Sequence, residues 1–236
     1  TMTLRQHEIT AKDADSILHN ILLFAPAVGF TGLGRKERKK LLLEYSKKQL
    51  LIGLFTATYG LGYRKMIIAE YESLVPEAQT CLLLVGLATH HDLSVQRGLI
   101  ETILRETFGV YRSIDETLQE LKGIVREDGG RLYARHPTYI NEIFRSRIAR
   151  DDSEQALVAL TTYFSSLPVP ISKHRERLGR SLVDLFKKTV NHSFVSFLLK
   201  EPNRVLNYYR CFERPFSQDG LFWLQMGLAY RNVGKH

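Results

Sequence analysis

The sequence predicts a mostly α-helical protein with a helical bundle, a domain that adds a small β-hairpin to its helices, and a helical, repeat-like spacer. Three observations support this prediction. Apolar residues recur at helical spacing over most of the 236 residues. An Asp-Gly pair between two short apolar runs is a strong hairpin signal. Prolines divide the second half of the chain into pieces of helix length.

The composition is that of an ordinary globular protein, with 44% hydrophobic and 25% charged residues. The formal charge of +8 permits nucleic acid or other anionic partners. However, the densest basic runs, at residues 35–40 and 173–177, are interrupted by glutamate, which favours solvated helix faces. Cys81 and Cys211 are too few for a disulfide-stabilised scaffold, so we expect a cytoplasmic location. The apolar runs are shorter than the roughly 20 residues of a membrane span, and no membrane contact is expected.

The first part of the chain carries three helical patterns. Asp13 or Asp15 is available to cap the first pattern. The second is unusually apolar in its later half, which predicts burial on most sides, and Gly60 and Gly62 end it. The patterns cover residues 15–24, 35–59 and 63–74, with a glycine-rich connection at 26–34.

The middle of the chain predicts three helices and then a hairpin. Pro76 suits a first helical position, and Ser113 with Glu116 forms a capping-box pattern. Asp128-Gly129 marks the hairpin turn. The expected helices cover residues 76–89, 95–104 and 114–126, a polar turn lies at 90–92, and a fourth helix at 138–148 follows Pro137. Three helices followed by a small hairpin is the order of a winged-helix domain, a helix-turn-helix variant.

The remainder of the chain predicts a helical spacer that ends in a repeat motif. Helices are expected at residues 154–166, 174–189, 192–200 and 203–212. Trp223, Gly227 and Tyr230 then match the tetratricopeptide pattern Trp-x2-Leu-Gly-x2-Tyr, with Met226 in the Leu position. Because one repeat cannot bury its own apolar face, we expect the chain to be an excerpt of a longer repeat protein. The alternative is a plain amphipathic helix.

The sequence contains no motif that would make the chain an enzyme on its own. It has no Gly-x4-Gly-Lys-Ser/Thr phosphate loop, no His-Glu-x-x-His, no cysteine pairs with zinc spacing and no Gly-x-Ser-x-Gly. We interpret His90-His91-Asp92 as a loop rather than a metal site, because adjacent side chains point apart on most backbones.

One stretch carries a family resemblance. Arg135-His136-Pro137 follows the hairpin and opens a helix. This resembles the end of the winged-helix domain in STAND NTPases, which carry Met-His-Asp there, and bacterial antiviral members often show an Arg-His-Pro form. The resemblance implies the following division: residues 1–34 are the tail of a preceding module or a linker, 35–74 a helical lid domain, 75–150 the winged-helix domain, 151–215 a helical spacer and 216–236 the start of a tetratricopeptide-like repeat.

The resemblance also implies a nucleotide-binding role for His136 and Arg135. In that family the motif histidine touches the β-phosphate of bound ADP and holds the module closed. A helix N-terminus attracts anions, and an imidazole donor adds a charge-assisted hydrogen bond. The implied cofactors are ADP and ATP, with magnesium held by a core upstream of this chain, and the isolated chain is expected to bind none. Arg135 and Pro137 depart from the motif, and His136 could instead make only a local hydrogen bond.

The resulting hypothesis is a regulatory part of a bacterial STAND NTPase in antiphage defence, which couples the sensing of a trigger to oligomerisation. The chain itself is expected to be no enzyme, whereas its parent is expected to be an ATPase. The implied partners are its own upstream NTPase core, a downstream repeat sensor, a protein trigger and further copies of itself as a homo-oligomer.

Two alternatives remain. In the first, the winged helix reads DNA through the helix at residues 114–126. Its three acidic residues outnumber its two basic ones, which suits a phosphate-lined groove poorly, so DNA is not expected as a partner. In the second, the chain is a helical protein-interaction scaffold whose basic faces bind an acidic partner.

Overall fold

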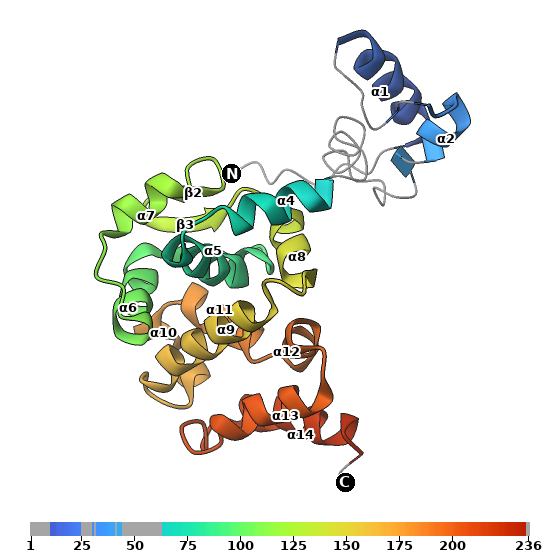
Figure 1. Ribbon diagram of the computed structural model, residues 1–236. Coiled ribbons are helices and arrows are strands. Elements are labelled where there is room, and N and C mark those ends of the chain that lie inside the picture. Colours follow the sequence, from blue (N-terminus) through green and yellow to red (C-terminus); the bar gives the residue numbers. More distant parts are fainter. Residues whose placement is uncertain (1–9, 25–29, 31, 41, 44–62, 235–236) are drawn as a thin grey trace. The chain divides into compact units, whose positions relative to one another are not determined.

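The computed structural model describes residues 10–24, 30, 32–40, 42–43 and 63–234, and Figure 1 shows their arrangement. The chain forms two compact units, Thr1–Glu70 and Tyr71–His236. The predicted fold class is confirmed, because the described residues are mostly helical and add one small antiparallel sheet. None of the helices in these ranges combines the length and the apolar character that a membrane crossing requires.

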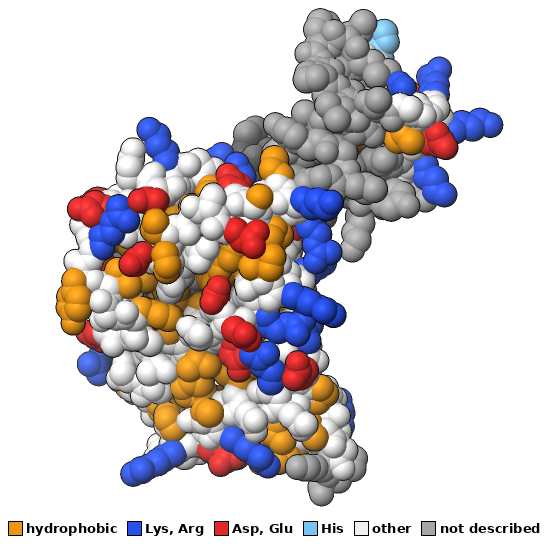
Figure 2. All heavy atoms as spheres, viewed as in Figure 1, with side chains coloured by type: hydrophobic (Ala, Val, Ile, Leu, Met, Phe, Trp, Pro, Cys, Tyr) orange, Lys and Arg blue, Asp and Glu red, His pale blue; other side chains and the backbone are white. Residues whose placement is uncertain are grey.

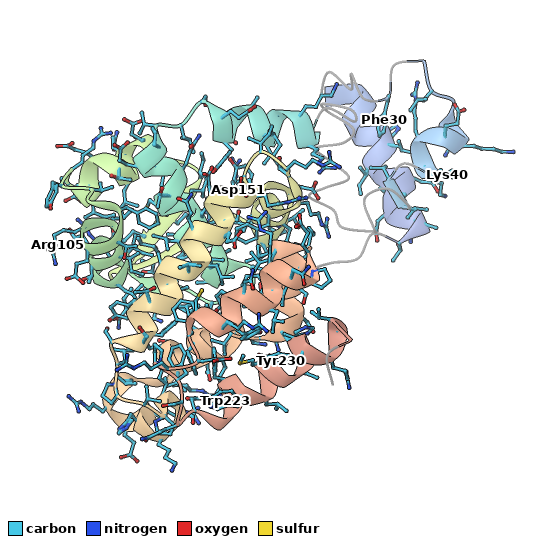
Figure 3. The ribbon with its side chains drawn as sticks, turned by 60° about the horizontal axis from the view of Figure 1, so that its bottom comes forward. Phe30, Lys40, Arg105, Asp151, Trp223 and Tyr230 are labelled. Carbon is cyan, nitrogen blue, oxygen red and sulfur yellow. The ribbon has the colours of Figure 1, made fainter. Side chains whose placement is uncertain are left out.

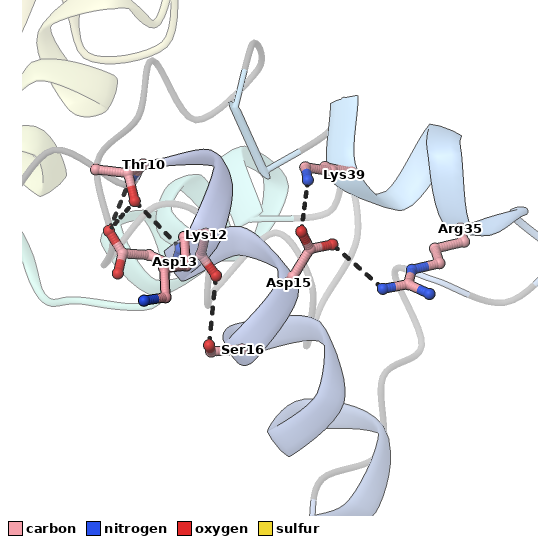
Figure 4. A network of polar contacts seen from close by, with 7 residues as sticks. All are labelled: Thr10, Lys12, Asp13, Asp15, Ser16, Arg35 and Lys39. Atoms are coloured by element: carbon pink, nitrogen blue, oxygen red, sulfur yellow. Dashed lines mark hydrogen bonds and ion pairs between the residues drawn. The ribbon is translucent and has the colours of Figure 1, made fainter.

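The first unit contains α1 (Ala11–Phe24) and α2 (Arg35–Lys40). Thr10 caps α1, because its hydroxyl accepts from the Asp13 N–H at 3.2 Å while the Asp13 carboxylate accepts from the Thr10 N–H at 2.9 Å. The helix therefore begins before the predicted residue 15, and neither Asp13 nor Asp15 is its N-cap. Asp15 instead accepts from Lys39 Nζ at 2.6 Å and so joins α1 to α2 (Figure 4).

The predicted long helix at 35–59 is described only at its start. Residues 35–40 are α-helical and residues 42–43 are in a π-helical turn. Leu42 packs with Ala14, Leu18 and Phe30 in a small buried cluster. The rest of that prediction, including its end at Gly60 and Gly62, lies outside the described residues. The next helix, α4 (Tyr63–Glu72), matches the predicted pattern at 63–74 and crosses the division between the two units.

Helix α5 (Pro76–Thr89) is the centre of the second unit, and its predicted bounds are confirmed. Every residue from 81 to 89 is buried. The elements packed around it include α6 (Arg97–Phe108), α7 (Ile114–Glu120), α8 (Pro137–Arg145), α9 (Arg150–Ser165) and strand β3 (Figure 1).

The predicted hairpin is confirmed as β2 (Val125–Asp128) and β3 (Arg131–Ala134). Asp128 pairs with Arg131, so the two-residue turn is Gly129-Gly130, whose φ angles are +55° and +72°. Both angles are in the left-handed region that glycine adopts without strain. A third strand, β1 (Val95–Gln96), pairs antiparallel with β3 and gives the order β1-β3-β2.

Two of the predicted helices therefore have wrong bounds, and α6 also continues past the predicted end at residue 104 to Phe108. The helix predicted at 95–104 begins at Arg97, because Val95 pairs with Leu132 in the sheet and is buried there. The helix predicted at 114–126 ends at Glu120, since Gly123 has a φ of +84° and the following residues enter β2. Ser113 caps α7 as predicted, although its hydroxyl accepts from the N–H of residue 115.

The helices from α9 onward form the part of the chain that we call the spacer, and here and in α8 several bounds differ from prediction. The helix predicted at 174–189 is divided by Gly179, whose φ of +82° breaks the helical path. The helix predicted at 138–148 ends at residue 145, and the one predicted at 154–166 begins at residue 150. The elements are η4 (Ile171–His174), α10 (Arg175–Leu178), α11 (Arg180–Thr189), α12 (His192–Leu199), α13 (Pro202–Cys211) and α14 (Gly220–Asn232).

A column of aromatic rings holds the spacer together. Successive ring centroids are 5.1–5.6 Å apart, which is the usual range for packed aromatic pairs. The column runs through Phe164, Phe186, Phe216, Phe222 and Tyr209, and so joins α9, α11, α14 and α13.

The buried carboxylate of Asp219 ties the start of α14 to η4. Its Oδ1 accepts from the N–H groups of Leu221 and Phe222, each at 3.1 Å, and its Oδ2 accepts from the Ile171 N–H at 3.2 Å. Asp219 is 1% exposed, so these three donors replace the water that its charge loses.

The contact between α5 and α8 should be sensitive to a single methyl group. A Cβ on Gly86 would meet Ile140 Cγ2 at 2.9 Å and Phe144 Cζ at 3.3 Å. We expect Gly86→Ala to lower the free energy of unfolding by about 1–2 kcal/mol, because overpacking outweighs the better helix propensity of alanine. Urea denaturation measures this change.

The matched control is Gly98→Ala, in α6. A Cβ there meets nothing within 4 Å, so the same substitution should leave stability unchanged or raise it by up to about 1 kcal/mol. Equal effects at both positions would contradict the packing argument.

Candidate functional site

The candidate site lies where β3 ends, beside the C-terminal end of α5. The Ala134 N–H donates to Thr89 Oγ1 at 2.9 Å, and that hydroxyl donates to the Val85 carbonyl at 3.1 Å. Both bonds are buried and lie in low dielectric, where a lost partner is costly. The end of the hairpin is thus fixed to α5 just before the predicted site residues Arg135 and His136.

His136 is the N-cap of α8. Its Nδ1 accepts from the Thr138 N–H at 3.1 Å, and Pro137 occupies the first turn as predicted. Because Nδ1 is the acceptor, the neutral ring carries its proton on Nε2, which is a hydrogen-bond donor. Burial lowers the pKa of the half-buried His136, and the carboxylate of Asp92 partly opposes this shift. The ring is therefore neutral at pH 7.

Arg135 is held by different contacts. Its backbone N–H donates to the Ile124 carbonyl at 2.7 Å, and its guanidinium lies over the Tyr139 ring, 4.7 Å from the centroid. Tyr139 is buried, so this cation–π contact stabilises the start of α8. The two predicted site residues are neighbours in the chain but make different contacts. His136 accepts a hydrogen bond from the first turn of α8, whereas the guanidinium of Arg135 lies over the ring of Tyr139.

His90 and His91 form the contact between the end of α5 and helix α12. They lie in the predicted polar turn, but both rings pack on aromatic side chains. His90 stacks on Phe197 with ring centroids 5.2 Å apart, and His91 meets the edge of Phe194 at 4.4 Å. His90 Nδ1 also hydrogen-bonds to Asn141 Oδ1 on α8. The two histidines therefore connect α5, α8 and α12.

The surroundings of these histidines keep both rings uncharged at neutral pH. Burial lowers the pKa of His90, against a smaller rise from its bond to Asn141. Burial, together with the smaller effects of His90 and Lys188, lowers the pKa of His91 to about 3. His91 Nε2 is buried without a hydrogen-bond partner. Within the described residues, no group of three or more His, Cys, Asp and Glu side chains is placed to hold a metal ion.

Sequence reasoning missed the partners of these histidines. Asn141, Phe194 and Phe197 lie far from His90 in the sequence, and nothing local joins them to it. One signal was available, because Phe194 and Phe197 are three residues apart and so share a helix face. That spacing predicts an aromatic surface, but not what covers it.

On the surface of α7 and the hairpin, arginine side chains form ion pairs with neighbouring carboxylates. Arg97 pairs with Asp115 at 2.8 Å and with Glu127 at 3.3 Å. Arg112 pairs with the two glutamates of α7, Glu116 at 2.9 Å and Glu120 at 3.1 Å. Acidic and basic side chains are accordingly interspersed over this region in Figure 2.

The tetratricopeptide-like helix α14 has an open side. Trp223 and Leu224 are 42% and 60% exposed, and a Cβ added to Gly227 would meet nothing within 4 Å. Trp223 and Tyr230 are labelled in Figure 3. The guanidinium of Arg210 lies 5.6 Å from the centroid of the Tyr230 ring. Met226, in the Leu position of the pattern, is buried.

Comparison with known proteins adds no relative: no family model, no curated protein and no solved structure matches this chain.

The histidine contact predicts a pH-dependent stability. A histidine whose pKa is lowered by folding binds protons more readily in the unfolded chain. The free energy of unfolding should therefore be highest above about pH 6.5, the ordinary histidine value, and fall as the pH drops toward 3, where His91 itself titrates. Urea denaturation at several pH values measures this trend.

His91→Phe keeps an aromatic ring but removes the titrating group. The free energy of unfolding should therefore change less steeply with pH, by an amount that corresponds to at most one bound proton per molecule. His174→Gln, in η4 and outside this contact, is the control and should leave the trend unchanged. A His91→Phe protein with the full pH dependence would contradict the assignment to this ring.

The cap on α8 can be tested separately. His136→Ala removes the acceptor for the Thr138 N–H and should cost about 1 kcal/mol of stability. His136→Asn supplies another good N-cap acceptor and should restore most of this loss. Equal destabilisation by both variants would show that the ring does more than cap the helix.

Proposed function

We propose that this chain is the regulatory module of a STAND-class NTPase, in which the nucleotide state of an ATPase core sets the position of the hairpin-bearing winged-helix domain. The observation that carries the proposal is the placement of His136. Its ring caps α8 directly after the hairpin and keeps an Nε2–H donor. A donor beside a helix N-terminus is suited to an anionic oxygen.

In the proposed mechanism, His136 would donate from Nε2–H to the β-phosphate of ADP, and Arg135 would be a nearby cation. Such a contact to a charged group is worth about 1.5–3 kcal/mol. The ADP-bound, closed state is favoured by that amount over the open one, which changes their ratio by about 10- to 150-fold. Because Thr89 fixes the end of β3 to α5, the hairpin, α5 and α8 would move together when the contact is lost.

The wider assignment follows from the same proposal. The ATP or ADP, with its magnesium, would be held by an NTPase core that is not in this chain. The open side of α14, with Trp223 and Gly227, is suited to a further helix of a repeat sensor. A protein trigger would act there, and release of the module would expose a homo-oligomerisation surface. We place this activity in antiphage defence and in the cytoplasm.

DNA reading by the third helix is the weaker alternative. Specific recognition needs side chains that are available to base edges in the major groove. Arg97 and Arg112, beside α7, are engaged by the protein's own carboxylates, and the exposed side of α7 is acidic.

The proposal is tested in the protein that carries this chain together with a phosphate-loop core. His136→Ala and His136→Asn should both release bound ADP at least about tenfold faster and raise basal activity, since alanine has no donor and the shorter asparagine amide does not extend to the position of the imidazole Nε2. Stopped-flow release of a fluorescent ADP measures the rate. His136→Asn is the decisive variant, because it keeps the helix cap.

His174→Gln serves as the matched control and should retain ADP like the unchanged protein. If His136→Asn also retains ADP and shows no autoactivity, His136 is a helix cap and the proposed contact is wrong. A chain whose natural context lacks a phosphate loop would refute the whole assignment.

A further inference from the structure

One segment of the spacer carries a dense run of exposed cations. We define the basic strip as six exposed cations of η4, α10 and α11: Lys173, Arg175, Arg177, Arg180, Lys187 and Lys188. Only two acidic residues, Glu176 and Asp184, lie between its ends. The strip thus carries a net charge of +4, from six cations and two carboxylates.

Most of these cations have no carboxylate partner. Arg180 pairs with Asp184 at 3.6 Å. The other five cations of the basic strip form no ion pair with any residue that the structure describes. The arginines near α7 differ, because each is paired twice. The strip therefore presents charge that the protein itself does not neutralise.

The fold directs this charge outward. On α11, Val183 and Phe186 face the core, while Arg180, Lys187 and Lys188 are exposed. Arg131 of β3 helps to hold the helix in place, since its guanidinium donates to Ser181 at 2.7 Å. The cations of α11 therefore belong to a helix that is fixed to the rest of the unit.

We propose that the basic strip binds the phosphodiester backbone of nucleic acid without reading its sequence. This inference does not depend on the STAND assignment. Backbone binding needs cations and few apolar contacts, and its free energy comes from the release of counterions. The α11 helix is about 15 Å long, and that length of duplex carries about nine phosphate charges. The strip can therefore engage its cations without a fixed register.

An acidic protein and an anionic membrane surface fit the strip less well than nucleic acid. A protein interface needs a buried apolar or aromatic centre, and a membrane surface needs apolar side chains that insert. All six side chains of the strip are charged, and the large apolar side chains that are exposed in the described residues belong to other segments of the chain, at Tyr111, Ile148, Val158, Trp223 and Leu224. The strip thus offers charge without an apolar anchor, which is the requirement of a phosphate backbone.

The test is a salt titration of the full chain with a fluorescein-labelled random-sequence DNA duplex of about 30 base pairs, followed by anisotropy. Binding should weaken as salt rises. The variant Lys173→Gln/Arg177→Gln/Lys187→Gln should bind at least about tenfold more weakly at low salt and reduce the salt slope by about 2–3. A single-stranded RNA of equal length should respond in the same way, because the backbone is shared.

The control removes the same charge from other exposed sites. Lys122→Gln/Arg126→Gln/Arg214→Gln also removes three cations, two of them next to or within β2. It should change the affinity less than about twofold, and circular dichroism should show both variants folded. Equal losses in the two variants, or no loss in the first, would overturn the proposal. So would binding to phosphatidylserine vesicles or polyglutamate in place of nucleic acid.

Discussion

The burial of α5 on all sides is the constraint on which the second unit depends. From residue 81 to 89 the helix has no exposed position, and α6, α7, α8, α9 and β3 pack against it. A fully buried leucine or valine contributes about 1.5–3 kcal/mol, whereas a whole domain is stable by only about 5–15 kcal/mol. The buried side chains of α5 therefore help to position every element that packs against it. Gly86 shows how close this packing is, since α8 occupies the space of a side chain there.

The end of this helix also links the parts that a regulatory module would have to move. Thr89 holds the last residue of β3, and the next two residues, His90 and His91, reach α8 and α12. The candidate residue His136 is the second residue after β3, and the nearby carboxylate of Asp92 acts to raise its pKa. A force on His136, where the phosphate contact is proposed, would thus reach the spacer through one short segment.

Local signals predicted much of the fold. Pro76 predicted the start of α5, Asp128-Gly129 predicted the hairpin with its turn one residue too early, and Pro137 predicted the first turn of α8. Features that depend on distant partners were missed. The two-residue strand β1 exists only because it pairs with β3, and the histidine contact requires residues of α12. In the candidate site, the motif located His136, but the cap, its tautomer and the neighbouring Asp92 are properties of the folded chain.

The aromatic column has a mechanical consequence. Its rings belong to α9, α11, α13, α14 and the segment before α14, and close-packed rings resist compression. A helical spacer could be a flexible tether that isolates its two ends. This one is built as a strut, so a load applied at the open side of α14 would be delivered to α9, which lies directly on α5. The two ends of the spacer would then move together, because the spacer transmits a displacement from one end to the other.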